Sequence, residues 1–204
     1  WSTEHILAMR YVCGIPIEQT AQAPQDIRDA IATRLIELTL RELFTFGVMQ
    51  TDPNFANYLY DAETDRIVLL DFGATRELEP KIVNQYRRLL LAGLAQDDAS
   101  LEEISGEIGF WGAETAPAHR AKITGLIQLV FQTLQAEPLV DFTKTELSRR
   151  MQAEGLALAE DGFVPPPLPI DVLLLQRKFG GVFLLAARLR ASVDVIGLLN
   201  KYLM

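Results

Sequence analysis

The chain has 204 residues, of which 49% are hydrophobic and 23% charged, a composition that predicts a globular domain long enough to bury a core. Its 19 basic and 27 acidic residues give a net charge of −8, which argues against bulk nucleic-acid binding because phosphate backbones select basic faces. The single cysteine excludes an internal disulfide, and no apolar run approaches the roughly 20 residues that a membrane-spanning helix needs.

The first predicted elements are a strand and a long helix. Residues 6–12 read as a buried strand that ends at Gly14. A natural chain seldom begins one step before a core element, so we expect further residues upstream. The apolar spacing of residues 26–46 predicts a helix, with Asp26 as its N-cap and Gly47 as its stop.

A β-hairpin is predicted in the middle of the chain. The polar loop 50–57 leads into two short strands, 57–60 and 66–70. The polar residues 61–65 between them predict the turn.

The remainder of the chain predicts a helical array. The expected helices span residues 80–96, 100–108, 117–136, 143–159, 170–190 and 193–203. Residues 164–169 contain four prolines and predict a stiff extended connector. The predicted fold class is therefore mainly α, with one small hairpin.

Three polar residues surround the hairpin in an order typical of kinase-type phosphotransferases. Asp52 precedes Asn57 by five positions, and the sequence Asp71-Phe72-Gly73 follows the second strand. Phosphoryl transfer needs metal ions on the phosphate oxygens and a carboxylate beside the attacking oxygen. We therefore expect the hairpin to bring Asn57 and Asp71 together as metal ligands, with Asp52 facing the nucleophile. Gly73 is expected to give the backbone freedom after the metal ligand.

Residues 50–77, QTDPNFANYLYDAETDRIVLLDFGATRE, resemble the AarF/UbiB family of atypical kinase-like proteins. The resemblance is closest to the branch that supports coenzyme Q (ubiquinone) biosynthesis. Residues 6–19 resemble the family's hinge strand, and residues 163–167 and 176–181 resemble its late segments. The resemblance implies that residues 1–204 form the C-terminal lobe of a protein-kinase-like fold, with the metal-binding residues on the hairpin.

The resemblance also implies ATP and Mg²⁺ as cofactors and assigns roles to matching residues. Asp71 takes the position of the principal magnesium ligand, Asn57 that of the second ligand, and Asp52 that of the catalytic base. Backbone groups near Arg10 and Val12 take the position that meets adenine. Relatives commonly carry an acidic residue where this chain has Arg10, which puts a side-chain bridge from the hinge in doubt.

The resemblance further divides the lobe and implies a missing part. It gives a hinge strand at 6–14, a catalytic-loop core at 15–80 and a family-specific helical part at 81–204. Residues 1–80 contain no lysine, so the lysine that pairs with ATP phosphates cannot lie upstream of the catalytic loop here. We expect it on an N-terminal lobe absent from this chain, and we expect residues 1–204 alone to be inactive.

The segment after Gly73 bears on the substrate. Only residues 74–79 separate Gly73 from the helix that begins at Pro80, and no Ala-Pro-Glu sequence follows. Protein kinases place their peptide-binding activation segment there. The short segment favours a small-molecule kinase or an ATPase.

Two other classes of function remain open. The protein could be a nucleotide-gated scaffold or lipid-handling module, in which ATP only biases conformation. It could also be an aminoglycoside-type kinase, although such kinases usually begin this loop with His-Gly-Asp and this chain has Gln50-Thr51-Asp52. The expected partners are ATP, the N-terminal lobe, and peripheral membrane or ubiquinone-biosynthesis proteins, without nucleic acid. The expected location is the cytoplasm or the mitochondrial matrix, including the periphery of the inner membrane.

The last long helix is basic on an acidic protein. It carries Arg177, Lys178, Arg188 and Arg190. We interpret these residues as a solvated helix face, in preference to a contact with anionic lipid head groups.

Overall fold

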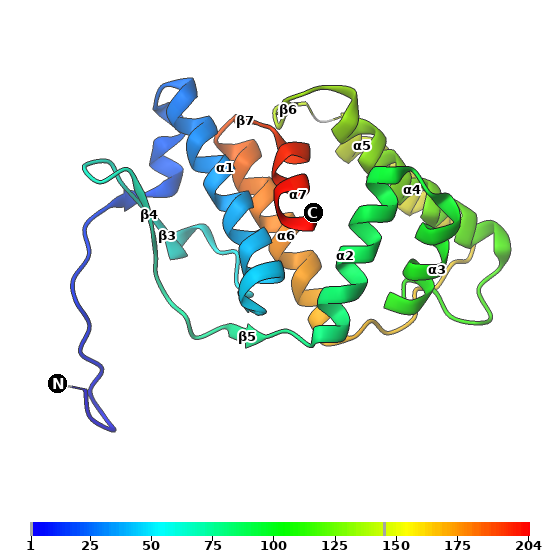
Figure 1. The fold of residues 1–204 in the computed structure, drawn as a ribbon, viewed down its shortest axis with the longest axis horizontal. Coiled ribbons are helices and arrows are strands. Elements are labelled where there is room, and N and C mark those ends of the chain that lie inside the picture. Colours follow the sequence, from blue (N-terminus) through cyan, green and yellow to red (C-terminus); the bar gives the residue numbers. More distant parts are fainter. Residues whose placement is uncertain (1, 145) are drawn as a thin grey trace.

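The computed structural model describes residues 2–144 and 146–204 and confirms a mainly helical fold with small sheets (Figure 1). The helices are α1 (Gln25–Arg41), α2 (Pro80–Ala95), α3 (Asp98–Ile108), α4 (Pro117–Ala136), α5 (Glu146–Glu160), α6 (Ile170–Arg188) and α7 (Val195–Leu203). Two 3₁₀ turns, Ile17–Gln22 and Phe55–Asn57, and one π-helical turn, Glu42–Phe46, complete the helical elements. No helix within the described ranges has a stretch long and apolar enough to cross a membrane.

The strands are short and pair only antiparallel. They are β1 (Ile15–Pro16), β2 (Val48–Gln50), β3 (Tyr58–Asp61), β4 (Arg66–Leu69), β5 (Thr75–Glu77), β6 (Val140–Asp141) and β7 (Ser192–Val193). The predicted hairpin is confirmed as β3 and β4, with β1 added on the other side of β3. The pairs β2–β5 and β6–β7 were not predicted, because strands of two or three residues carry no readable alternation.

Helix α1 confirms the predicted long helix but begins and ends differently. Pro24 occupies the N-cap and Asp26 lies in the first turn, so the prediction of Asp26 as the cap is wrong. Pro24 lacks an N–H and has an extended backbone, which suits the residue before a helix. After Arg41 the chain continues as the π-helical turn, and Gly47 then ends it with a φ of 64°, as predicted.

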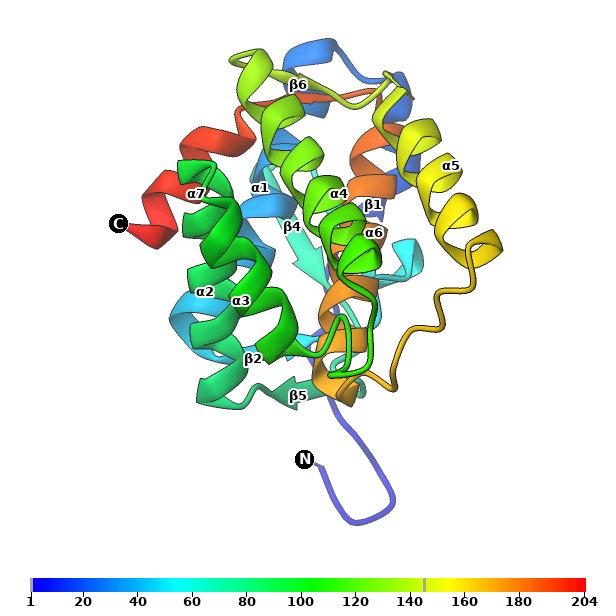
Figure 2. The ribbon, with the colours of Figure 1, turned by 90° about the vertical axis from the view of Figure 1, so that its right-hand side faces the viewer.

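Two apolar clusters form the core, and α6 contributes to both. In the first, α6 residues such as Val182 and Leu185 pack with α1, α7, α4 and the hairpin. In the second, Val172 and Leu175 of α6 pack with α2, α3 and the chain around Met49. In Figure 1, α1, α6 and α7 lie next to one another and α2 lies to their right. Figure 2 shows α4 and α5 on the face beside α6. Helix α6 therefore lies at the centre of the molecule.

The predicted strand at residues 6–12 is wrong. These residues form no regular structure, and Met9 and Tyr11 are 79% and 87% exposed. Figure 1 shows the segment leading away from the helices. A strand is stabilised by its neighbours, and no partner strand lies beside this segment in the part of the chain that the structure describes.

The helices after residue 80 agree closely with prediction. Helix α4 has the predicted bounds, and residues 164–169 are extended without regular structure, as expected. Helix α5 begins at Glu146, whereas its predicted start at residue 143 lies in a turn. Helix α6 ends at Arg188, two residues early, because Arg190 adopts a left-handed backbone with a φ of 51°.

Candidate active site

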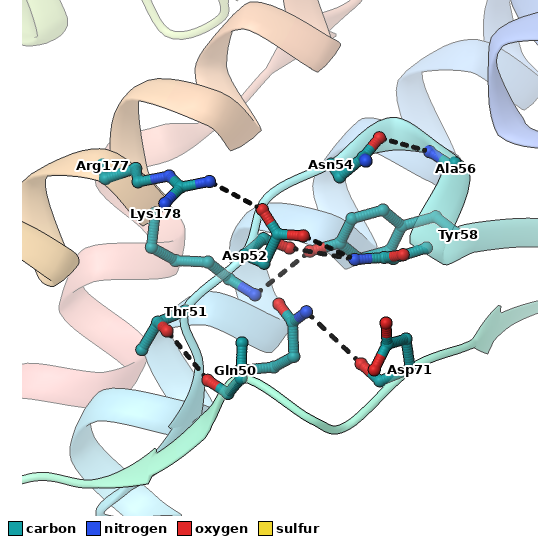
Figure 3. A network of polar contacts seen from close by, with 11 residues as sticks. Gln50, Thr51, Asp52, Asn54, Ala56, Tyr58, Asp71, Arg177 and Lys178 are labelled. Carbon is teal, nitrogen blue, oxygen red and sulfur yellow. Dashed lines mark hydrogen bonds and ion pairs between the residues drawn. The ribbon is translucent and has the colours of Figure 1, made fainter.

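The loop 51–57 connects β2 to β3 and carries two of the predicted site residues. Its first residue is fixed by the segment after Gly73, because the N–H and hydroxyl of Thr51 both donate to the carbonyl oxygen of Ala74, at 3.1 and 2.8 Å. Its last turn is capped by Asn54, whose side-chain oxygen accepts from the N–H of Ala56 at 3.0 Å (Figure 3). Both ends of the loop are therefore held by local hydrogen bonds.

Asp52 and Asn57 lie together in this loop. Nδ2 of Asn57 donates to Oδ2 of Asp52 at 3.2 Å, and Nη2 of Arg177 donates to Oδ1 of Asp52 at 2.8 Å. Each carboxylate oxygen therefore has its own partner, and the Asp52 side chain is about one-third exposed. The amide nitrogen of Asn57 faces Asp52, which leaves its oxygen as the atom available to a cation.

Asp71 is placed by the hairpin ladder. The N–H of Leu70 donates to the carbonyl oxygen of Asn57 at 2.8 Å, so Asn57 lies opposite Leu70 and Asp71 is the next residue after this pair. Among the described residues no hydrogen bond joins the two side chains directly. Asp71 itself is exposed and has a φ of 56°, a left-handed conformation that aspartate tolerates better than most residues.

Gly73 plays a different part from the one predicted. Its φ does not lie in the left-handed region; that conformation belongs to Asp71, two residues earlier. The N–H of Gly73 donates to Oδ1 of Asp71 at 2.9 Å, and a Cβ on Gly73 would lie 3.0 Å from the same oxygen. A side chain at position 73 would press on this oxygen, so the glycine eases the contact that orients the Asp71 carboxylate.

The donor set of the loop and hairpin suits a hard cation. It consists of oxygen atoms from Asn57 and Asp71, and magnesium prefers oxygen ligands. No cluster of three or more histidine, cysteine, aspartate or glutamate residues occurs in the described ranges. Magnesium is commonly held by one or two protein groups together with substrate phosphates and water. These two residues fit such a shared site and do not form a closed protein cage.

Arg10 and Val12 are not brought to these residues. Arg10 is exposed, Val12 is 40% exposed, and both lie in the extended segment before β1. Within residues 2–144 and 146–204 no hydrogen bond or ion pair joins either of them to Asp52, Asn57 or Asp71.

Helix α6 contributes a residue that sequence reasoning assigned wrongly. Lys178 is 1% exposed, so it does not belong to a solvated face. Its Nζ lies 3.1 Å from Oε2 of the buried Glu42 and 3.1 Å from Oη of Tyr58. Burial raises the pKa of the Glu42 carboxyl, and the Lys178 ammonium partly opposes that rise.

The burial of Lys178 had a readable signal in the sequence. Val172, Leu175, Val182 and Leu185 are buried on one stripe of α6, and position 178 falls on the same stripe. A lysine on an apolar stripe predicts a buried partner of opposite charge. The contact between Arg177 and Asp52 had no such signal, because 125 residues separate the two.

Two further contacts join α6 to the loop and hairpin region. A Cβ on Gly181 would lie 2.3 Å from Cβ of Pro53, so only glycine permits α6 to approach the loop this closely. Near the start of α6, the buried Asp171 accepts from Nε of Arg76 in β5 at 2.5 Å.

An apolar cavity lies apart from these residues, among α4, α5, α6 and the turn at β6. Its volume is about 490 Å³. Its apolar lining includes Leu134, Phe142, Leu147, Phe183 and Leu184. Pockets for small ligands typically measure roughly 300–1,000 Å³ and are mostly apolar. The cavity therefore has the size and lining of a site for an apolar small molecule.

Comparisons of the sequence with known proteins match atypical kinase-like proteins. The family model for the ABC1 atypical kinase-like domain matches residues 1–105. A rat protein described as the mitochondrial atypical kinase COQ8B is 36% identical over 94% of this chain and 36% of its own length. Mitochondrial atypical kinases named coq-8 in Caenorhabditis elegans and COQ8 in Saccharomyces cerevisiae are each 33% identical over 98% of this chain, which covers 27% and 40% of their lengths.

The fold is also shared with a solved structure. The complex of Rv3197 with erythromycin from Mycobacterium tuberculosis superposes with a TM-score of 0.73 at 17% sequence identity. The match covers 94% of this chain and 48% of that one. The chain thus spans about half of this solved structure and roughly a third of the curated relatives.

Proposed function

Because this chain belongs to the ABC1 atypical kinase-like family, we propose that it is the catalytic-loop lobe of an ATP-dependent phosphotransferase or ATPase that supports coenzyme Q biosynthesis. The observation that carries this proposal is the contact of Asn57 with Asp52, beside a hairpin whose second strand is followed by Asp71. The chain covers 27–40% of the lengths of the three relatives named above, so the activity belongs to the intact protein.

The proposed roles follow from what each residue contacts. The Asp52 carboxylate accepts the proton of the attacking oxygen, while Asn57 and Arg177 orient it. Asn57 and Asp71 hold magnesium, which neutralises charge on the phosphates when bound. Backbone groups near Arg10 and Val12 meet adenine as the resemblance implies, and the exposure of this segment is compatible with that contact.

The acceptor is proposed to be a small molecule or water. Residues between Gly73 and Pro80 include β5, whose three residues are all paired with β2. This pairing uses the segment for structure and leaves no platform of the kind that binds peptides in protein kinases. Proteins of coenzyme Q biosynthesis and the membrane surface are the proposed partners. The relatives named above are described as mitochondrial, which favours a mitochondrial location over the cytoplasm.

The test is magnesium-dependent ATP hydrolysis by the intact protein. Asp52→Asn should abolish most turnover, because the amide cannot accept the proton. Residues 1–204 alone should be inactive, since the lysine that pairs with ATP phosphates is expected on the other lobe and the first lysine of this chain is Lys81. Equal turnover by residues 1–204 and the intact protein would contradict the proposal that a second lobe completes the site.

A second candidate function is lipid handling gated by nucleotide. The apolar cavity among α4, α5 and α6 favours it, because a phosphotransferase has no evident use for a pocket away from Asp52. In that case ATP would bias conformation, and binding of an apolar ligand would change with nucleotide. The two candidates are separated by Asp52→Asn, which should remove function only if turnover itself is required.

A further inference from the structure

We propose that α6 forms part of the candidate active site and that Arg177 is a positioning residue for Asp52. The inference rests on the proposed function and adds a residue to it. It is not contained in the family match, which ends at residue 105, whereas α6 begins at Ile170.

The geometry at Asp52 carries the first step. A carboxylate held at one oxygen can still rotate about its bond to Cβ, whereas one held at both oxygens has a fixed plane. Asn57 contacts Oδ2 at 3.2 Å and Arg177 contacts Oδ1 at 2.8 Å. The Arg177 contact joins two charged groups and is shorter, so it is the stronger of the two. Asn57 belongs to the same loop as Asp52, and among the described residues Arg177 alone anchors the carboxylate to a separate helix.

The second step is that α6 is itself held firmly against the loop. Lys178, next to Arg177, is buried against Glu42 and Tyr58. One turn later, Gly181 allows Pro53 to pack directly on the helix. Arg177 therefore projects from a rigid element whose distance to Asp52 is set by neighbouring contacts, which is the arrangement that gives a site precise geometry.

The third step separates positioning from stability. The Arg177 side chain is 61% exposed, and exposed ion pairs contribute little to stability because water screens them. Removal of its guanidinium should therefore leave the fold intact. A merely structural role would show in the melting temperature, and a positioning role would show in turnover.

The experiment uses the intact protein and four variants: Arg177→Ala, Arg177→Lys, Asp52→Asn and the double variant Arg177→Ala/Asp52→Asn. Arg188→Ala is the matched control, since Arg188 lies on the same helix, is exposed and pairs with Glu18 at 3.6 Å. For Arg177→Ala we expect kcat to fall by about 10- to 100-fold, while the KM for ATP changes by less than about threefold, because misplacement of a reacting group costs rate and not affinity. Arg177→Lys should recover part of kcat, and Arg188→Ala should match the unaltered protein.

The double variant tests whether Arg177 acts through Asp52. In the Asp52→Asn background, Arg177→Ala should cause no further loss, because residues that act as a unit are not additive. A further loss of similar size, unchanged kcat in Arg177→Ala, or a loss confined to the KM for ATP would overturn the inference; the last result would make Arg177 a phosphate ligand. Normal turnover in Asp52→Asn would instead contradict the proposed function itself.

Discussion

Nζ of Lys178 lies 3.1 Å from Oε2 of Glu42, and the two side chains are 1% and 8% exposed. The pair joins α6 to the π-helical turn that follows α1. The N–H of Gln50, at the end of β2, lies 3.4 Å from Oε1 of Glu42, so the pair also reaches the residue before the candidate catalytic loop. A buried charge without its partner is costly, so each residue of the pair depends on the other.

Lys178→Met should therefore destabilise the protein by about 3–5 kcal/mol, because it leaves the Glu42 carboxyl buried and unpaired. Glu42→Leu combined with Lys178→Met should recover most of that loss, since a well-packed apolar pair can replace a buried ion pair. Lys201→Met is the control: Lys201 pairs with Glu37 at 2.5 Å but is 60% exposed, and its loss should cost about 0.2–1 kcal/mol. Urea unfolding measures all three, and equal losses for Lys178→Met and Lys201→Met would contradict the role of burial.

Gly180 and Gly181 are adjacent in α6, so alanine substitutions at the two positions form a matched pair of variants. A Cβ on Gly180 meets no atom within 4 Å, whereas a Cβ on Gly181 would lie 2.3 Å from Pro53. Gly180→Ala should be neutral or stabilise by up to about 1 kcal/mol, as helix glycines replaced by alanine generally do. Gly181→Ala should instead displace the loop and lower both the melting temperature and ATP turnover. Similar behaviour of the two variants would show that the loop does not depend on contact with α6.

Asp71→Asn should weaken the binding of the magnesium on which turnover depends. The substitution keeps the shape of the side chain and removes its charge, and hard cations prefer charged oxygens. We expect the magnesium concentration for half-maximal ATP hydrolysis to rise on the order of tenfold or more, by comparison with losses seen when metal-site residues are altered. Asp61→Asn, at the far end of the same hairpin, is the control. An unchanged magnesium titration in Asp71→Asn would remove Asp71 from the metal site.

The Asp65 carboxylate in the turn of the hairpin should make part of the stability of the protein sensitive to acid. Arg34 and the hydroxyl of Tyr60 donate to its carboxylate, and these bonds lower the pKa of Asp65 from 3.8 to about 2. Because the folded-state pKa is the lower one, the unfolded chain binds the proton more readily. The contribution to stability is therefore complete above pH 4 and is lost as the pH falls through about 2.

Asp65→Asn should accordingly show a smaller decrease in melting temperature between pH 5 and pH 2 than the unaltered protein. Asp26→Asn, at an exposed position in the first turn of α1, removes one carboxylate elsewhere and serves as the control. If Asp65→Asn and Asp26→Asn gave the same pH dependence, the bonds from Arg34 and Tyr60 would not account for it.

The cavity among α4, α5 and α6 should bind a neutral apolar probe such as Nile red. Gly180 lines it, and its open side can accommodate a larger residue, so Gly180→Leu should fill part of the cavity and reduce binding. Gly125→Leu on α4 is the control, because a Cβ there also meets no atom within 4 Å and Gly125 does not line the cavity. If the two variants enhanced the fluorescence of Nile red equally, the probe would bind outside this cavity.

The elements that depend on local patterns could be predicted from the sequence. Apolar spacing specified α1, α2 and α4, because a helix of 16–20 residues repeats its pattern over several turns. The polar turn between β3 and β4 specified the hairpin, and the order of Asp52, Asn57 and Asp71 around it identified the candidate site. These features are local, so neighbouring residues suffice to predict them.

The features that need a distant partner appear only in the folded chain. Residues 6–12 have the apolar character of a strand, but no neighbouring strand exists beside them among the described residues, so they remain extended and exposed. Lys178 and Arg177 are adjacent and similar in charge, yet one is buried against Glu42 and the other holds Asp52 at the edge of the loop. The apolar stripe of α6 indicates that Lys178 is buried, but the groups that Lys178 and Arg177 contact lie 120 or more residues away in the chain, and only the packing of α6 brings them together.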